Sequence, residues 1–226
     1  MTVLEPLRTI DHAVLRPDCT RGEVLNACAL AARLGVAGVC VHPRWVPTAA
    51  AALDGTAVAV GTVVGFPLGA TTTEAKCLEA LQAFEDGARE VDMVLAVTAL
   101  KSGDYREALL DIAAVVAVAR DSGVERALVK VILEMCYLTP EEKRIAADLA
   151  VQGGADYVKT STGMGPSGAT VEDVALLREL VPRHIGVKAA GGIRSLADLR
   201  AMLAAGADRI GTSATEAIAA ELAAGG

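Results

Sequence analysis

The sequence predicts an α/β protein of one domain, a closed (β/α)8 TIM barrel over residues 1–226. Two observations carry this prediction. One phrase is repeated along the chain, in which a helical pattern ends at a glycine and a short apolar run follows. In addition, Ala, Val, Leu and Gly dominate a composition with 53% hydrophobic and only 3% aromatic residues, which suits parallel strands covered by helices. An open, doubly wound sheet is the alternative arrangement of the same elements.

The glycine of each repeated phrase marks a helix end. "ARLGVAGVCVHP" places Gly35 after a last helical turn, and "EDGAREVDMVLAV" does the same with Gly87. Glycine adopts the left-handed conformation that closes a helix. The phrase recurs at Gly123, Gly154 and Gly206. Two copies, "GADYVKTS" and "GADRIGTS", are nearly identical, as a repeated βα unit predicts.

Eight apolar runs between the helical patterns are the predicted strands. They cover residues 9–14, 37–41, 57–66, 90–97, 127–134, 157–160, 186–190 and 209–212. Helices are expected between them. The clearest starts after Thr139, in "TPEEKRIAADLAVQ", with proline at its first position and an acidic first turn. Thr170 and Ser195 are predicted to cap two further helices. No Pro- or Ser-rich linker divides the chain, which favours one domain.

Charged residues interrupt four predicted strands in succession. Asp92 lies in "EVDMVL", Lys130 in "VKVILE", Lys159 in "YVKTST" and Lys188 in "GVKAAGG". Taken singly, a lysine here predicts a solvated strand tip and the aspartate a hydrogen-bonded structural group. Together they predict a site, because neighbouring parallel strands lie ~4.8 Å apart and barrel sites form at the carboxyl ends of strands. Burying several ammonium groups without function would also be costly.

A lysine in such a cluster can become a reactive amine. The pKa of a free lysine is ~10.4, and desolvation and neighbouring cations lower it. A neutral amine attacks a carbonyl and forms a Schiff base. The protonated Schiff base withdraws electrons from the adjacent carbons, so a carbon–carbon bond beside the former carbonyl can break or form. A nearby carboxylate such as Asp92 would transfer the protons.

Small residues follow the last two predicted strands. "KAAGGIRS" leads into the helix capped by Ser195, and "RIGTSATEA" leads into the next helix. Backbone N–H groups at helix N-termini bind phosphate, and the loops after the seventh and eighth strands of barrels are a frequent place for it. We therefore expect a phosphate at Gly191 and Gly192, with a simple tight turn as the alternative. Arg194 either adds positive charge or lies on the surface.

The segment "GMGPSG" at residues 163–168 matches G-x-G-x-x-G but is not predicted to bind a dinucleotide. Pro166 interrupts it, the helix starts only after Thr170, and no acidic residue follows about 20 positions later. We expect a loop over the mouth of the barrel.

Charge and cysteine usage exclude several function classes. The net charge of −7 and the lack of a basic tract argue against a nucleic-acid partner. The five cysteines are odd in number and contain no C-x-x-C pair, and the three histidines have no metal-ligand spacing. The uncharged stretch 55–73 predicts a strand and loop rather than a membrane span. The start lacks a signal-peptide pattern. We expect a cytoplasmic protein with no metal and no cofactor.

The motifs together resemble a known family. They are "IDHAVLRP", "GVCVHPRWV", "VVGFPLGATTTEAK", "EVDMVL", "VKVILE", "GADYVKTSTG", "VKAAGGIR" and "RIGTSA". In this order, from about Ile10 to Ala214, they are similar to the deoxyribose-phosphate aldolases. The resemblance implies a class I aldolase without metal that interconverts 2-deoxy-D-ribose 5-phosphate with D-glyceraldehyde 3-phosphate and acetaldehyde, in the breakdown of deoxyribose phosphates. Barrels of this kind often form dimers, so a homo-oligomer such as a dimer is expected, although the sequence identifies no interface.

The resemblance assigns roles to matching residues. Lys159 corresponds to the Schiff-base lysine, Lys188 to a second lysine that perturbs the first and relays protons, and Asp92 to the acid/base carboxylate. Cys40 receives no catalytic role. The other matching residues are Lys130 and Asp11 around the relay, Thr162 and Gly163 at the substrate, and Gly191, Gly192, Gly211 and Ser213 in the phosphate loops.

The chain also departs from the family pattern. Ala13 stands where a threonine is frequent, and Met164 where a phenylalanine or lysine is frequent. Glu216 is expected to point away from the phosphate. The sequence ends "AAELAAGG" without the tyrosine of some members, which implies slower turnover or protonation by water. Another lysine-dependent phosphosugar lyase, synthase or isomerase on the same barrel is the alternative function, followed by a non-catalytic ligand-binding barrel.

Overall fold

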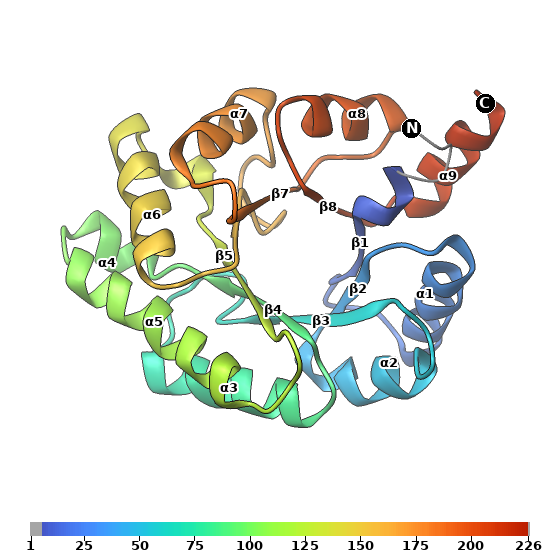
Figure 1. The fold of residues 1–226 in the computed structure, drawn as a ribbon, viewed down its shortest axis with the longest axis horizontal. Coiled ribbons are helices and arrows are strands. Elements are labelled where there is room, and N and C mark those ends of the chain that lie inside the picture. Colours follow the sequence, from blue (N-terminus) through green and yellow to red (C-terminus); the bar gives the residue numbers. More distant parts are fainter. Residues whose placement is uncertain (1–5, 226) are drawn as a thin grey trace.

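The computed structural model describes residues 6–225, which form a closed barrel of parallel strands surrounded by helices (Figure 1). Each strand pairs with the next along the chain, and β8 pairs with β1 to close the sheet. This closure confirms the predicted (β/α)8 barrel and rules out the open doubly wound sheet. The lack of a signal-peptide pattern is predicted from residues 1–12, of which residues 1–5 lie outside the described part.

The strands are shorter than most of the predicted runs. They are β1 Ile10–Val14, β2 Gly38–Val41, β3 Ala59–Val64, β4 Glu90–Val94, β5 Leu128–Ile132, β6 Tyr157–Lys159, β7 Gly186–Ala190 and β8 Arg209–Thr212. The bounds of β7 and β8 confirm the prediction, whereas the runs 57–66, 90–97 and 127–134 were too long. Leu95 and Leu133 explain why, because both are fully buried although they follow the ends of β4 and β5. An apolar run marks buried residues, and at the mouth of the barrel the buried residues continue past the strand ends into the loops.

The helices form the outer ring of the barrel (Figure 1). They are α1 Arg21–Leu34, α2 Val46–Ala52, α3 Thr73–Glu85, α4 Val97–Lys101, α5 Tyr105–Asp121, α6 Pro140–Gln152, α7 Val171–Leu180, α8 Leu196–Ala204 and α9 Thr215–Ala224, with short 3-10 turns at η1 Pro6–Thr9, η2 Pro43–Trp45 and η3 Met135–Tyr137.

The predicted helix boundaries are confirmed by their caps. The side chains of Thr139, Thr170 and Ser195 each accept a hydrogen bond from a backbone N–H in the first turn of α6, α7 and α8. All five phrase-ending glycines have positive φ, from 64° at Gly35 to 107° at Gly206. An L side chain is strained in this conformation, so glycine is required where the chain leaves these helices and turns back toward the barrel.

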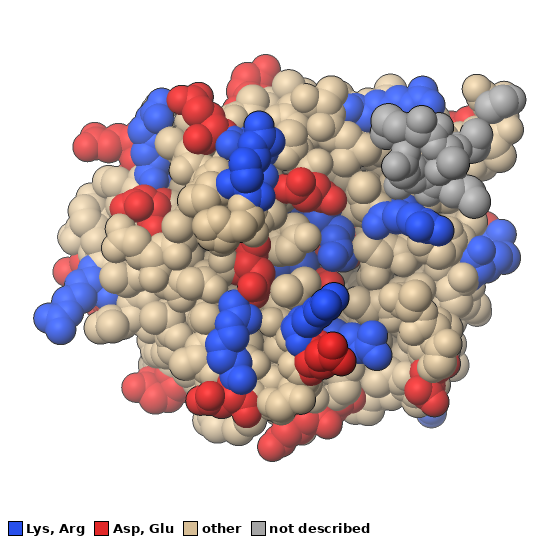
Figure 2. Space-filling model, viewed as in Figure 1, with Lys and Arg blue, Asp and Glu red and all other residues tan. Residues whose placement is uncertain are grey.

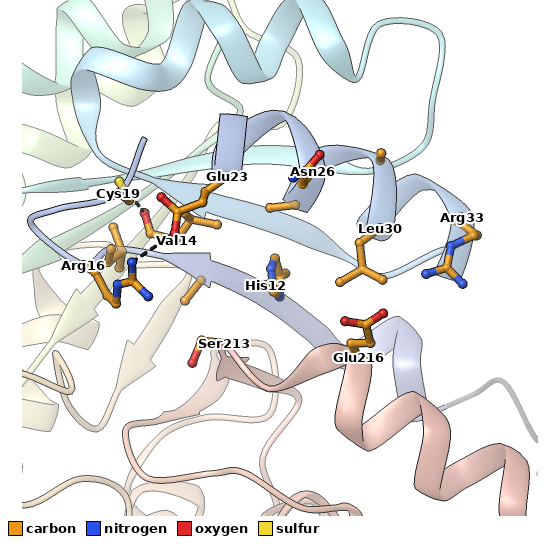
Figure 3. A pocket seen from close by; sticks show the side chains of 14 residues that line it. His12, Val14, Arg16, Cys19, Glu23, Asn26, Leu30, Arg33, Ser213 and Glu216 are labelled. Carbon is orange, nitrogen blue, oxygen red and sulfur yellow. Dashed lines mark hydrogen bonds and ion pairs between the residues drawn. The ribbon is translucent and has the colours of Figure 1, made fainter. Parts of the chain in front are cut away.

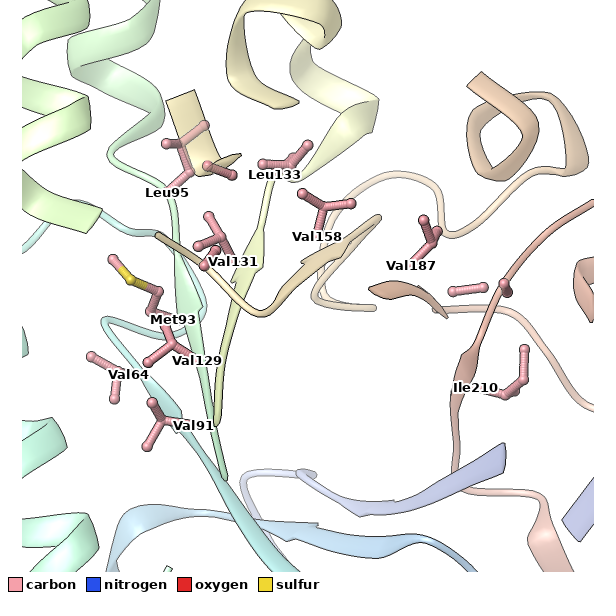
Figure 4. Packing of buried hydrophobic residues seen from close by; sticks show 14 of the residues in the cluster. Val64, Val91, Met93, Leu95, Val129, Val131, Leu133, Val158, Val187 and Ile210 are labelled. Carbon is pink, nitrogen blue, oxygen red and sulfur yellow. The ribbon is translucent and has the colours of Figure 1, made fainter. Parts of the chain in front are cut away.

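Side chains on the strands alternate between the barrel interior and the helices. Val91 and Met93 of β4 and Val129 and Val131 of β5 belong to the main hydrophobic core, which packs between strands and helices (Figure 4). The residue between the two valines of β5, Lys130, therefore points into the barrel. The same alternation places the outward Val158 and Val187 directly before the lysines of β6 and β7.

The surface carries both signs of charge. On the face shown in Figure 2, lysine and arginine side chains are interspersed with aspartate and glutamate. Among residues 6–225, no helix has the length and apolar character needed to cross a membrane.

Candidate active site

The four predicted charged residues meet inside the barrel around one carboxylate. Asp92 Oδ2 lies 2.8 Å from Lys159 Nζ and 2.7 Å from Lys188 Nζ. Its other oxygen, Oδ1, lies 3.0 Å from Lys130 Nζ. The strand register produces this convergence, because Asp92 is paired with Lys130 and Lys159 with Lys188 on adjacent strands. All four side chains are buried.

A second set of charges lies behind this centre. Asp11 Oδ2 is 2.6 Å from Lys188 Nζ, and Asp11 Oδ1 is 2.6 Å from the Arg209 guanidinium. Glu90 accepts from Lys130 at 2.5 Å and from Arg209 at 3.3 Å. The sequence reasoning included Asp11 but missed Glu90 and Arg209. The signal was available, because each lies two positions before a predicted site residue, Asp92 or Gly211, and residues two apart share one face of a strand.

Two glycines make room for these side chains. A Cβ at Gly38 would lie 3.0 Å from Asp11 Oδ1, and a Cβ at Gly211 would lie 3.3 Å from Lys188 Cε. Gly211 therefore serves the packing of the lysine cluster in addition to any contact with a ligand.

The two lysines that share Asp92 Oδ2 have opposite pKa shifts. Burial lowers the pKa of Lys159, and the Lys188 ammonium lowers it further, while Asp92 opposes both effects. Burial also disfavours the charged form of Lys188, but the carboxylates of Asp11 and Asp92 outweigh it and raise the pKa of Lys188. For Asp92, burial opposes ionisation, yet the three lysines hold its pKa well below its usual range. The arrangement thus combines a lysine that loses its proton more readily with a neighbour that keeps it.

A cavity of about 220 Å³ opens onto this cluster at the carboxyl ends of the strands. Asp92 and Lys130 do not line it, because they lie behind the two amines. Ala13, Met164 and Arg16 also face the cavity; Arg16 was not predicted. The predicted site residues that line it are Asp11, Lys159, Thr162, Gly163, Lys188, Gly191, Gly192, Gly211 and Ser213.

The predicted phosphate loops line the cavity, but three backbone donors at the start of α8 already have acceptors within the chain. Asp198 accepts from the backbone N–H groups of Arg194 and Ser195, and Glu221 accepts from that of Leu196. The chain's own carboxylates therefore already occupy these three donors. The open donors lie just before them and at the end of β8. Within residues 6–225, the backbone N–H groups of Gly192, Ile193 and Ser213 donate to no protein acceptor, and all three residues line the cavity.

The segment 163–168 is a loop at the cavity, as predicted. Gly168 packs so closely on Gly191 that a Cβ there would lie 2.2 Å from the Gly191 carbonyl oxygen. The loop is joined to β7 by the Ala169 N–H, which donates to the carbonyl of Ala190 at 3.1 Å.

Glu134 is a further residue that the sequence reasoning missed. It follows β5, is buried, and accepts hydrogen bonds from both the backbone N–H and the hydroxyl of Thr162. Its φ of 51° and ψ of 60° place it in the left-handed region, which is uncommon for a residue other than glycine. The motif "VKVILE" contained this residue, but its end was interpreted only as the end of a strand.

A larger groove of about 710 Å³ lies outside the barrel, between α1 and the start of α9 (Figure 3). Glu216 lines this groove beside His12 and Arg33, and not the cavity above the lysines. The prediction that Glu216 points away from the phosphate loops is therefore confirmed. His12 Nδ1 is 2.8 Å from the Thr215 hydroxyl. Burial lowers the pKa of His12, with Glu216 opposing this shift.

Comparison with known proteins places this site in a family. The family model of the DeoC/LacD aldolases matches residues 7–218. The chain belongs to the DeoC/LacD aldolase family. This membership agrees with the resemblance carried by the motifs, and it makes the chain an aldolase.

Individual relatives of this aldolase cover nearly the whole chain. The deoxyribose-phosphate aldolase of Geobacillus sp. (strain WCH70) is 54% identical over 91% of this chain and 91% of its own. That of Thermoanaerobacter pseudethanolicus is 51% identical over 95% of each chain. Among solved structures, the deoxyribose phosphate aldolase of Aeropyrum pernix, described as having a unique tetrameric structure, has a TM-score of 0.91 and 31% identity over 98% of this chain and 92% of its own.

Proposed function

We propose that this aldolase reversibly cleaves 2-deoxy-D-ribose 5-phosphate to D-glyceraldehyde 3-phosphate and acetaldehyde through a Schiff base on Lys159. The observation that carries the proposal is the position of Lys159: its amine lines the cavity, and burial together with Lys188 lowers its pKa. A neutral amine at this place can attack the substrate aldehyde. The reaction belongs to the breakdown of deoxyribose phosphates.

The proposed cleavage begins with formation of the Schiff base. The Lys159 amine adds to the C1 aldehyde, and loss of water leaves a protonated Schiff base. A base then takes the proton of the C3 hydroxyl, the C2–C3 bond breaks, and its electron pair flows into the Schiff base to give an enamine. The C3 carbon leaves as the aldehyde of D-glyceraldehyde 3-phosphate. Protonation of C2 and hydrolysis release acetaldehyde and return the free amine.

Lys188 and Asp92 are assigned to the proton transfers. Lys188 reaches the cavity and keeps its proton, so it serves as the acid near the substrate. Asp92 lies behind both amines within hydrogen-bond distance of each. It therefore exchanges protons with Lys159 and Lys188 rather than with the substrate directly. Lys130 and Asp11 hold the charges of this relay in place through their ion pairs.

The phosphate group is assigned to the glycine loops. Gly191 and Gly192 have φ of 89° and 83°, and the open N–H groups of Gly192, Ile193 and Ser213 supply donors on one side of the cavity. Arg194 also lines this end and adds positive charge. Backbone donors of this kind bind phosphate oxygens well. Thr162 and Gly163 also line the cavity and would contact the sugar.

The proposal is tested by trapping the Schiff base. Borohydride reduction in the presence of acetaldehyde should add an ethyl group to one lysine, and peptide mass spectrometry should place it on Lys159. Loss of retro-aldol activity in parallel, with activity retained when acetaldehyde is omitted, is the expected result. Modification at another lysine, or an absence of any adduct in an active enzyme, would contradict the assignment. The predicted homo-oligomer stays a prediction that sedimentation can test.

A further inference from the structure

The Thr162 hydroxyl lies at the cavity, and most of its hydrogen-bonding positions are already occupied. Its hydrogen is donated to Glu134 Oε2, and its oxygen accepts the backbone N–H of Met164 at 3.0 Å. A hydroxyl has one hydrogen and two lone pairs. One lone pair therefore remains, and Thr162 is 7% exposed on the cavity wall.

Glu134 is held in a fixed position to receive this hydrogen. The N–H of the residue before it, Leu133, donates to the Lys159 carbonyl at 2.9 Å, and the N–H of the residue after it, Met135, donates to the Thr160 carbonyl at 2.9 Å. Both neighbours are thus tied to the strand that carries Lys159. Glu134 itself takes the left-handed conformation between them. A non-glycine residue keeps such a conformation only where its surroundings over-determine it.

Among the described residues that line the cavity, Thr162 is the one that donates to the Glu134 carboxylate. Its Oε1 accepts the Thr162 backbone N–H at 3.1 Å, while its Oε2 accepts the hydroxyl. Cys136 Sγ lies 3.8 Å from Oε1. Since a carboxylate has acceptors and no donor, the hydroxyl hydrogen is drawn away from the cavity.

We propose that Glu134 is a specificity-determining positioning residue, which makes the Thr162 hydroxyl a pure hydrogen-bond acceptor toward the substrate. Such an acceptor binds a substrate hydroxyl and discriminates against the analogue that lacks it, because the buried lone pair is then left unpaired. This inference rests on the proposed function. The C3 hydroxyl loses its proton during cleavage, so the C4 hydroxyl, which keeps its proton throughout, is the donor assigned to Thr162.

The test compares two acceptor aldehydes in the synthetic direction with acetaldehyde. One is D-glyceraldehyde 3-phosphate, and the other is 3-phosphooxypropanal, which lacks only the hydroxyl next to the aldehyde carbon. In Glu134→Gln the amide can donate to Thr162 Oγ1, which releases the hydroxyl hydrogen toward the cavity. We expect kcat/KM for the hydroxylated aldehyde to fall about tenfold, mainly through KM, and that for 3-phosphooxypropanal to change less than about twofold.

Four further measurements make the outcome decisive. Thr162→Val should lower the preference for the hydroxylated aldehyde to the same extent, and the double variant should lower it no further. The exposed Glu179→Gln is the matched control and should leave the preference unchanged. Acetaldehyde trapping on Lys159 should be as efficient in Glu134→Gln as in the unmodified enzyme.

Equal losses for both aldehydes, or a loss of trapping in Glu134→Gln, would assign Glu134 a structural role and overturn the inference. A preference that survives in Thr162→Val would also overturn it. Failure of the unmodified enzyme to trap acetaldehyde or to cleave deoxyribose 5-phosphate would instead contradict the proposed function.

Discussion

Two buried lysine–aspartate regions of this protein differ in how the positive charge of the lysine is compensated. Outside the barrel, Lys76 of α3 donates to Asp111 Oδ2 at 2.5 Å and to the Val94 carbonyl at 2.9 Å, and the Thr73 hydroxyl donates to Asp111 Oδ1 at 2.9 Å. Lys76 has no exposed surface. Inside the barrel, Lys159 has one carboxylate partner among residues 6–225, Asp92, which it shares with Lys188.

The difference shows that burial alone does not make a lysine reactive. Lys76 has a carboxylate of its own and a carbonyl and is fully buried, so its positive charge is matched locally. Lys159 shares its counter-charge with a second cation and faces an open cavity. A lysine becomes a nucleophile where its ammonium is poorly compensated and its amine is accessible.

The largest effect is expected from Lys159→Met. Removing the amine removes the Schiff base, so kcat for cleavage of deoxyribose 5-phosphate should fall on the order of 10⁴-fold. A coupled assay of acetaldehyde release measures it, and the circular dichroism spectrum serves as the control for folding. Full activity in this variant would show that Lys159 is not the lysine that forms the Schiff base.

A large effect on stability, and a small one on chemistry, is expected from Lys76→Met. Asp111 would remain buried without its cation, which costs about 3–5 kcal/mol of unfolding free energy. Denaturant titration measures this loss, and kcat per folded molecule should stay within a few-fold. Joint replacement with Asp111→Leu should restore most of the stability, because an apolar pair of similar volume needs no counter-charge. Unchanged stability in Lys76→Met would show that the Lys76–Asp111 ion pair does not stabilise the fold as its contacts imply.

Lys188→Met should lower kcat about 10²-fold through loss of a proton-transfer group. It should also change the pH profile in a defined direction. The Lys188 cation lowers the pKa of Lys159, so its removal raises that pKa and reduces the neutral fraction at pH 7. The rising limb of the kcat/KM profile, which reports deprotonation of Lys159, should therefore move to higher pH. A limb that stays in place, or moves to lower pH, would be inconsistent with perturbation of Lys159 by Lys188.

The smallest effect is expected from Cys40→Ala. Cys40 lines the cavity, but burial raises the pKa of its thiol to about 11, with Asp92 adding to the shift. The thiol is therefore protonated at neutral pH and is a poor nucleophile. We expect kcat within about threefold of the unmodified enzyme and only slow alkylation by iodoacetamide. A loss as large as that of Lys188→Met would give Cys40 a role that its protonation state does not support.

Much of the fold followed from local signals. Glycines that end helices, hydroxyl caps that begin them and apolar runs between them depend on neighbouring residues, so they were readable in order along the chain. The strand ends were less accurate because Leu95 and Leu133 are buried beyond the last paired residues. The lysines of successive strands also pointed to a site, because parallel strands bring equivalent positions together.

The sequence by itself determined the barrel and the positions of its buried lysines and glycine loops, because these depend on periodicity, caps and strand order. Only the tertiary structure decided how the charges are shared. Arg209 pairs with Asp11 and Glu90 on other strands. Asp198 and Glu221 accept from the backbone at the start of α8, and Glu134 orients the Thr162 hydroxyl. These contacts depend on residues far apart in the chain or on the direction of a side chain. Hydrogen bonds and ion pairs act over a few ångströms, so their partners are known only when the strands and loops are in place.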